Sequence, residues 1–343
     1  MSIVSNKPTI TRNELEGVLD CLINDELTSR HPVVLFEKSL SEMTGYTYCC
    51  ALQSPTSAYH VALCALGITA GDEVIVPSYF TQSALNAICL CGAEPVLLDI
   101  DENSLSASVE RYQAAVTDRT KAVIIGHTGG IYVDSESYKS LPVPVIEDIS
   151  HCLGVEAQES NAGYFGTIAL SSFSPNDMIT TGSGGAVFTS NSRYYSTMKD
   201  LRQSPQKISF DYSMTDFQAA MGISQITRLK DFIRRRQEIA KVYYDRVRLT
   251  PHTVLFPFND ACVYQSFPVI FDAASDKILK YFKKNGIELY PPVQYPLHSI
   301  LGLKRLDYPN SDRMTKKMFS LPIYPTLTGK EIEKIGRVVA KFV

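Results

Sequence analysis

The chain has 343 residues, of which 45% are hydrophobic and 20% are charged, as in an ordinary globular protein. Its formal net charge of −3 at pH 7 gives no electrostatic reason to expect nucleic acid or an anionic membrane as a partner. Because the length exceeds the usual size of one hydrophobic core, we expect a large domain with a smaller companion.

The chain start and the cysteines indicate where the protein is expected to work. The amino terminus lacks a signal-peptide pattern, and no apolar run reaches about 18 residues. The eight cysteines, which include Cys49, Cys50, Cys89 and Cys91 in apolar segments, show no metal-ligand spacing. We therefore expect a cytoplasmic protein with reduced structural thiols and no metal site.

Two helices are predicted at the start of the chain. Residues 11–23 have helical spacing, with Thr11 as the cap and Glu14 three residues later. Residues 36–43 repeat the spacing and stop before a glycine, which suits a helix C-terminus.

A strand predicted at residues 48–52 runs into Ser54, Pro55, Thr56 and Ser57. A turn and helix start at this point can hold an anion with backbone N–H groups, but Pro55 has no N–H to donate. A proline is also common at the start of an ordinary helix. The local sequence leaves both interpretations open.

Further apolar runs then alternate with helical stretches. Predicted strands are residues 74–76, a run beginning at residue 92, and residues 117–125, 143–146, 168–173 and 186–189. This alternation favours a mostly parallel sheet covered by helices on both faces.

Polar side chains gather after two of these strands. Glu147 and Asp148 follow the strand predicted at residues 143–146, and open α/β sheets bind ligands at the carboxyl ends of their strands. Ser172 and Asp177 lie in a polar loop between the last two strands. We expect these side chains to share one site.

The C-terminal third has a different pattern. A long helix after residue 228 carries arginines 234–236, which we interpret as a solvated face. Prolines then punctuate short extended runs, and residues 276–284 form a predicted helix. We predict a large α/β/α domain over residues 10–245 and a small α+β domain over residues 246–343.

Several stretches together resemble the DegT/StrS-type nucleotide-sugar aminotransferases, a branch of the fold-type-I pyridoxal-phosphate (PLP) enzymes. They are V-I-E-D-I-S-H-C-L-G at 145–154, A-L-G-I-T-A-G-D-E-V-I-V-P-S-Y at 65–79, T-T-G-S-G-G-A-V-F-T at 180–189, Y-P-L-H at 295–298 and L-P-I-Y-P-T-L-T at 321–328. The resemblance covers nearly the whole chain. It implies an aspartate-aminotransferase-like fold: a three-layer α/β/α large domain with a mostly parallel sheet, and a small C-terminal α+β domain.

The resemblance also assigns roles to individual residues. Asp148 falls on the aspartate that pairs with the pyridinium nitrogen, and His151 falls beside the ring hydroxyl. Ser172 matches a phosphate-binding serine, and Thr56 and Ser57 lie in the turn that holds the phosphate. Asp148 and His151 also have a purely structural alternative, in which Asp148 caps the following helix and His151 fills the vacated pocket.

Other positions depart from the family pattern. Asp177 occupies the position of the lysine that forms the Schiff base, and an aspartate cannot form that bond. Thr81 stands where an aromatic ring covers the cofactor, and Asp211 stands where an asparagine reaches the partner's phosphate across a dimer. With Pro55 in the phosphate turn, these changes surround one ligand.

The leading hypothesis is therefore a lysine-less relative without ordinary transaminase activity. It would form a homodimer and bind a nucleotide-linked sugar, or serve as a partner subunit, in deoxyamino-sugar or surface-polysaccharide biosynthesis. Covalent PLP is not expected, whereas weak non-covalent binding of PLP or pyridoxamine phosphate (PMP) stays open. One rival is a PMP-dependent nucleotide-sugar dehydratase with Asp177 as the base. Another is a structural subunit with an empty pocket.

Overall fold

The computed structural model describes residues 2–25, 27–28, 31–130, 135–155, 165–255, 257–260 and 262–342. Within them, a seven-stranded sheet has the order β1-β7-β6-β5-β4-β2-β3. Its strands are β1 (Tyr48–Leu52), β2 (Glu73–Pro77), β3 (Glu94–Leu98), β4 (Thr120–Gly126), β5 (Val145–Asp148), β6 (Ile168–Ser172) and β7 (Gly185–Thr189). Only β7 pairs antiparallel, with β1 and β6. The predicted mostly parallel sheet is confirmed.

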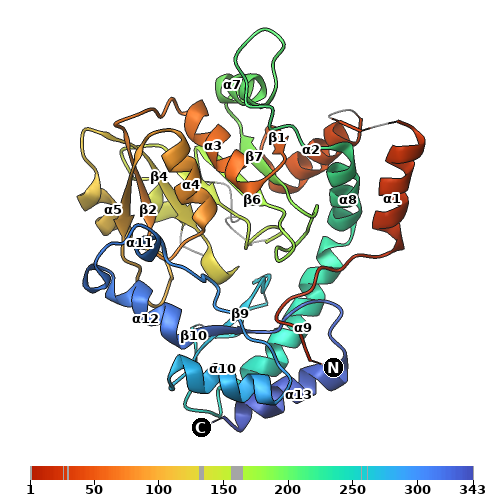
Figure 1. The fold of residues 1–343 in the computed structure, drawn as a ribbon, viewed down its shortest axis with the longest axis vertical. Coiled ribbons are helices and arrows are strands. Elements are labelled where there is room, and N and C mark those ends of the chain that lie inside the picture. The colour runs from red at the N-terminus through yellow and green to blue at the C-terminus, as the bar shows by residue number, and fades with distance from the viewer. Residues whose placement is uncertain are drawn as a thin grey trace.

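Helices cover both faces of this sheet, as alternate residues of β1 demonstrate. Cys50 and Leu52 pack into the core under α3 (Pro55–Ala65), whereas Cys49 and Ala51 pack into the core under α2 (His31–Thr44). The other helices of this part are α1 (Arg12–Ile23), α4 (Gln82–Leu90), α5 (Val109–Ala115), η1 (Thr128–Gly130), α6 (Ser135–Tyr138), α7 (Ser192–Arg202) and α8 (Asp216–Thr227) (Figure 1). No helix among the described residues combines the length and apolarity needed to cross a membrane.

Strand β5 lies two residues later than the sequence indicated. The prediction placed the strand at residues 143–146, but the ladder with β4 runs from Val145, opposite Val123, to Asp148, opposite Gly126. The reason is Pro144, which has no N–H to donate and contributes only its carbonyl, to the Val123 N–H at 3.0 Å. Asp148 is thus the last residue of the strand, and the ladder fixes its backbone.

A second, three-stranded antiparallel sheet has the order β10-β9-β8. Its strands are β8 (Thr253–Val254), β9 (Phe267–Ile270) and β10 (Met318–Leu321), and the later helices are α9 (Leu229–Val247), α10 (Ser275–Lys284), α11 (Leu297–Ile300), η2 (Arg305–Asp307), α12 (Pro309–Lys317) and α13 (Gly329–Ala340). In Figure 1 this sheet lies among α9, α10 and α13, away from the seven-stranded sheet. Ile3 pairs with Ile287, so the N-terminal residues also join this part. The division at residues 245 and 246 remains a prediction.

Helix α9 corrects the interpretation of the arginine run as a solvated face. Arg234 is exposed, but Arg236 is buried. Its guanidinium donates to the backbone carbonyls of Gln265 at 2.9 Å and Ile323 at 2.8 Å. Burial lowers the pKa of Arg236 to about 10. Arg236 therefore connects α9 to the loop before β9 and to the loop after β10.

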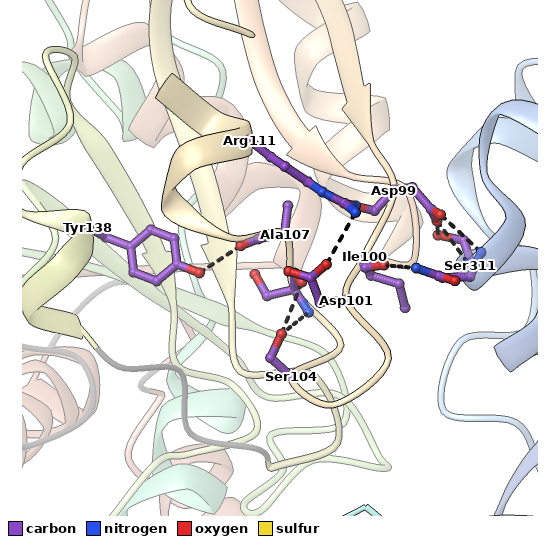
Figure 2. A network of polar contacts seen from close by, with 10 residues as sticks. Asp99, Ile100, Asp101, Ser104, Ala107, Arg111, Tyr138 and Ser311 are labelled. Carbon is purple, nitrogen blue, oxygen red and sulfur yellow. Dashed lines mark hydrogen bonds and ion pairs between the residues drawn. The ribbon is translucent and has the colours of Figure 1, made fainter. Parts of the chain in front are cut away.

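A polar contact joins the end of β3 to α12 (Figure 2). The Asp99 carboxylate accepts hydrogen bonds from the backbone N–H groups of Asn310 and Ser311, both at 2.9 Å, and from the Ser311 hydroxyl at 2.6 Å. The Asn310 amide also donates to the carbonyl of Ile100 at 2.7 Å. A carboxylate at a helix N-terminus satisfies amides that have no partner within the helix. Asp99 thus caps a helix that follows it by more than two hundred residues.

Candidate functional site

A cavity of about 310 Å³ opens at the carboxyl ends of the central parallel strands. The start of α3, the start of α4, the segments after β4, β5 and β6, and a loop before α11 contribute to its wall. The lining residues are Pro55, Tyr59, Phe80, Thr81, Gln82, Ser83, His127, Thr128, Asp148, Ser150, His151, Ser172, Ser174, Asp177, Pro292, Val293, Gln294 and Tyr295. The position agrees with the rule that such sheets bind ligands at these strand ends.

Asp148 lies at the end of β5 with its carboxylate held by protein donors. Oδ1 accepts from the Ser150 N–H at 2.8 Å and from the Ser150 hydroxyl, and Oδ2 accepts from the Tyr59 hydroxyl. Burial, and then the negative charge of Asp148, raise the pKa of Tyr59 well above its usual range. Tyr59 therefore stays protonated and donates. Sequence reasoning missed it, because only the tertiary fold brings this α3 side chain to the end of β5.

Asp177, which the resemblance assigns to the lysine position, lies in the loop after β6 with its carboxyl group directed at polar neighbours. Oδ2 accepts from the Ser174 N–H at 2.6 Å. The Asp177 pKa is raised, chiefly by burial and also by the charge of Asp148, although hydrogen bonds from Ser172 and Ser174 and the nearby His151 oppose the shift. The site thus holds a carboxyl group that takes up a proton more readily than an ordinary aspartate.

His151 follows β5 and has a defined tautomer. Its Nδ1 accepts a hydrogen bond from the backbone N–H of Gly129 at 3.0 Å. Gly129 has φ 75°, a left-handed conformation that favours glycine. Since Nδ1 is an acceptor, the neutral imidazole carries its proton on Nε2 and can donate from that atom.

A buried pair lies beside the cavity, and one of its members, His127, lines the wall. His127 Nε2 lies 2.8 Å from Glu147 Oε1, and both side chains are fully buried. Glu147 Oε2 also accepts from the Gly166 N–H at 3.1 Å. The sequence pointed to Glu147 as a strand-end residue, but its partner His127 follows a different strand and could not be inferred.

The hydroxyl groups near β6 form a connected network. The Ser172 N–H donates to the Ser150 hydroxyl at 2.8 Å, and the Ser172 hydroxyl lies 2.9 Å from that of Ser174. Ser150 in turn donates to Asp148. Ser172 was a predicted cofactor contact, and the structure does place it in the wall of the cavity, within this network.

The polar groups of the predicted anion-binding turn at the start of α3 form hydrogen bonds within the first turn of that helix. Ser54 is the N-cap and Pro55 occupies the first helical position without an N–H. The Ser57 N–H donates to the Ser54 hydroxyl at 3.1 Å, and the Ser57 hydroxyl donates back to the Ser54 carbonyl at 2.7 Å. Position 55 therefore has no N–H to offer an anion, and the Ser57 N–H already has a partner. Thr56 and Ser57, both predicted contacts, lie outside the cavity lining.

Thr81 lies in the lining but acts as the N-cap of α4, accepting from the Ser83 N–H at 3.4 Å. The adjacent Phe80 brings an aromatic ring to the same wall and meets Tyr59 edge to face, with ring centroids 6.4 Å apart. Gly126 makes room for it, since a Cβ there would lie 2.1 Å from the Phe80 ring. An aromatic side chain thus reaches the site from the residue before the predicted one.

Asp211 and Lys199, the first lysine after Asp177 in the sequence, both lie away from the cavity. Asp211 is exposed, has φ 52° and does not line it. Lys199 Nζ is 4.7 Å from the centroid of the Tyr195 ring on its own helix α7. Among the described lining residues there is no Lys and no Arg.

These groups do not fit a covalently bound PLP. No lining amine is present to form the Schiff base, and the Asp148 oxygen Oδ2 already has a protein donor. A phosphate would meet two carboxyl groups, no lining cation and a helix start without a free first amide. The cavity instead offers carboxyl, hydroxyl and imidazole groups, which suit the hydroxyls of a sugar.

Comparison with known proteins identifies the relatives of this chain. The profile of the DegT/DnrJ/EryC1/StrS aminotransferase family matches residues 8–340. An uncharacterised protein of Methanocaldococcus jannaschii is 30% identical, with 98% of this chain and 96% of the relative covered. The GDP-perosamine synthase of Vibrio cholerae is 28% identical, with 98% of each covered. A solved structure that resembles this chain is Spr1654 of Streptococcus pneumoniae, described as a candidate sugar aminotransferase. Its PLP form superimposes with a TM-score of 0.91 and its PMP form with 0.90, both at 22% identity. The matches cover 99% of this chain, 99% of the PLP-form chain and 98% of the PMP-form chain.

Proposed function

We propose, from the premise that this chain belongs to the DegT/DnrJ/EryC1/StrS aminotransferase family, that it is a lysine-less member without ordinary transaminase activity. In this proposal it binds a nucleotide-linked sugar in deoxyamino-sugar biosynthesis, as a homodimer in the cytoplasm. The fold is that of a family aminotransferase, and the proposal concerns what the altered site does.

One observation carries the proposal. The Asp177 carboxyl group is held by the Ser174 N–H in a cavity whose described lining contains no lysine, and the motif resemblance puts Asp177 at the position of the Schiff-base lysine. An ordinary transaminase needs an amine there, both to hold the cofactor and to move the proton. A carboxylate can accept a proton but cannot form the covalent bond.

The proposed ligand follows from the relatives and from the cavity. The GDP-perosamine synthase of Vibrio cholerae is named for a nucleotide-linked sugar. The cavity of this chain keeps polar groups that can bind sugar hydroxyls, among them His151, Ser174, Gln294 and Tyr295. We propose that the hexose enters this cavity.

The test is a cofactor spectrum taken with a sugar-nucleotide titration. Purified protein is incubated with PLP, treated with borohydride to reduce any Schiff base, and analysed by mass spectrometry. We expect no protein–cofactor adduct, and we expect GDP- or UDP-linked deoxyhexoses to bind in calorimetry. An adduct on any lysine would refute the proposal. Failure of every sugar nucleotide to bind would favour a structural subunit.

A second candidate has one observation in its favour. An enzyme that uses free PMP to dehydrate a nucleotide sugar requires a group other than lysine to hold the proton, and the Asp177 pKa is raised by burial. Under this alternative Asp177 would be that base and His151 its neighbour. Sugar-nucleotide dehydration that depends on added PMP and is lost in Asp177→Asn would favour it over the first proposal.

A further inference from the structure

Three side chains that can bind a metal ion come from two helices and meet outside the cavity. His60 and Cys64 lie one turn apart on α3, and Cys91 is the C-cap of α4. One ligand atom from each residue lies within 4.8 Å of the other two. Residues four apart share a face of a helix, and α3 packs against α4, so the fold holds all three at one place.

The distances agree with metal coordination. The two sulfur atoms are 3.8 Å apart. Two thiolates bound to one tetrahedral zinc at about 2.3 Å each would lie about 3.8 Å from one another. A disulfide has an S–S distance of about 2.05 Å, so the pair is separated as two ligands of one ion would be.

Aromatic residues of the segment before α8 cover the cluster. The Tyr212 hydroxyl lies 3.2 Å from His60 Nδ1, and the Phe210 ring packs on the His60 ring with centroids 4.6 Å apart. Two thiols and an imidazole leave the fourth tetrahedral position for water or the Tyr212 hydroxyl. Cover of this kind holds the first ligands in place and limits solvent access.

We propose that His60, Cys64 and Cys91 bind one Zn²⁺ ion in a structural site that ties α3 to α4. The cysteine spacing in the sequence predicted no such site, because the residues belong to two helices. Both helices also contribute to the cavity, through Tyr59 and Ser83, so the ion would fix the separation of two of its walls.

The test uses the full-length protein, Zn²⁺ and Co²⁺. Reduced, metal-free protein is titrated with Co²⁺, and the thiolate-to-cobalt charge-transfer band and the tetrahedral ligand-field bands are followed. We expect saturation at one ion per chain, displacement by Zn²⁺, and a rise in melting temperature on metal addition. Cys64→Ser and Cys91→Ser should lose the charge-transfer band, whereas Cys89→Ser, an exposed residue on the same helix α4, should keep it.

A second measurement covers the case in which a variant fails to fold. Zn²⁺ should protect Cys64 and Cys91 of the wild-type chain from alkylation while Cys89 still reacts. Absence of both the cobalt band and the protection would show that the cluster is ordinary packing and overturn the proposal. A Cys64–Cys91 disulfide in wild-type protein isolated without reductant would also overturn it, as would loss of metal binding in Cys89→Ser.

Discussion

Replacing Tyr59 with Phe removes one oxygen atom from the cavity wall and tests how the Asp148 carboxylate is held. The Tyr59 hydroxyl donates to Oδ2, whereas both donors from Ser150 go to Oδ1. Hydrogen bonds to charged groups contribute about 1.5–3 kcal/mol each. Asp148 keeps 9% exposure, so water can replace part of the lost bond. We therefore expect a destabilisation near the lower end, about 1.5–2 kcal/mol.

A double-mutant cycle isolates this contact. Urea unfolding of Tyr59→Phe, Asp148→Asn and the double variant should give a coupling energy of at least about 1 kcal/mol. Tyr112→Phe is a matched control, because its buried hydroxyl donates to a neutral acceptor, the Ile124 carbonyl, at 2.9 Å. It should cost only about 0.5–1.5 kcal/mol. A coupling below about 0.5 kcal/mol would mean that Tyr59 does not hold the carboxylate.

The remaining predictions concern a buried proton, a helix cap and assembly. Burial raises the Asp177 pKa above 3.8, so the contribution of Asp177 to stability is fully present below that pH and is lost as pH rises through the folded-state pKa. Asp177→Asn should therefore be more stable than the wild type near pH 7, by about 1.4 kcal/mol for each tenfold fall in the acid dissociation constant of Asp177 on folding, and about equal to it near pH 4. Urea unfolding measures both differences, with Asp118→Asn, a change of an exposed aspartate, as the control. An equal difference at both pH values would contradict the sign. Asp99→Ala should lower the free energy of unfolding by about 2 kcal/mol, because it removes the cap of α12. Asp101→Ala is the control and should cost at most about 0.5 kcal/mol, because its partner Arg111 is exposed (Figure 2). Similar losses in the two variants would contradict the role of Asp99 as a cap. Sedimentation at micromolar concentration should show a dimer, and a monomer would count against the proposed assembly.

Much of the framework could be predicted because its signals are local. The capping pair Thr11 and Glu14 marked the start of α1, and the apolar run at residues 48–52 became β1 without change. The prediction for β5 began two residues too early, because it followed the β-branched side chains and ignored Pro144. Since Pro144 has no N–H, the ladder begins only after it. Burial of Arg236 was missed for a different reason, since its carbonyl acceptors lie on distant loops.

For the candidate site, the sequence predicted the positions of several residues but not their contact partners. Motif positions located Asp148, His151, Ser172, Thr81 and Asp177, and the structure brings these side chains around one cavity. The partners that define their chemistry could not be read from neighbouring residues, because they come from other elements. Tyr59 reaches Asp148 from a helix 89 residues earlier, and Cys64 meets Cys91 across 27 residues. Packing between elements, which a single sequence does not display, decides both contacts.

The final prediction concerns repair of the altered site. If the lysine were the only loss, Asp177→Lys should capture PLP, but we expect this single variant to bind it poorly. The new amine would lie near Asp148, which stabilises the charged form and leaves less of the free base that attacks an aldehyde. Pro55 would still lack its N–H.

A combined variant should do better. Adding Pro55→Gly restores a backbone amide at the start of α3, and Asp211→Asn removes a charge that, by the family resemblance, would face the phosphate in the partner subunit's cavity. Thr81 is kept because it caps α4. We expect PLP to bind at least about tenfold more tightly than to the single variant, a gain of about 1.4 kcal/mol. Titration followed by Schiff-base absorbance and borohydride trapping measures both. Tight capture by Asp177→Lys alone would mean that the phosphate site is intact, and it would make the PMP-dependent enzyme the better description of this chain.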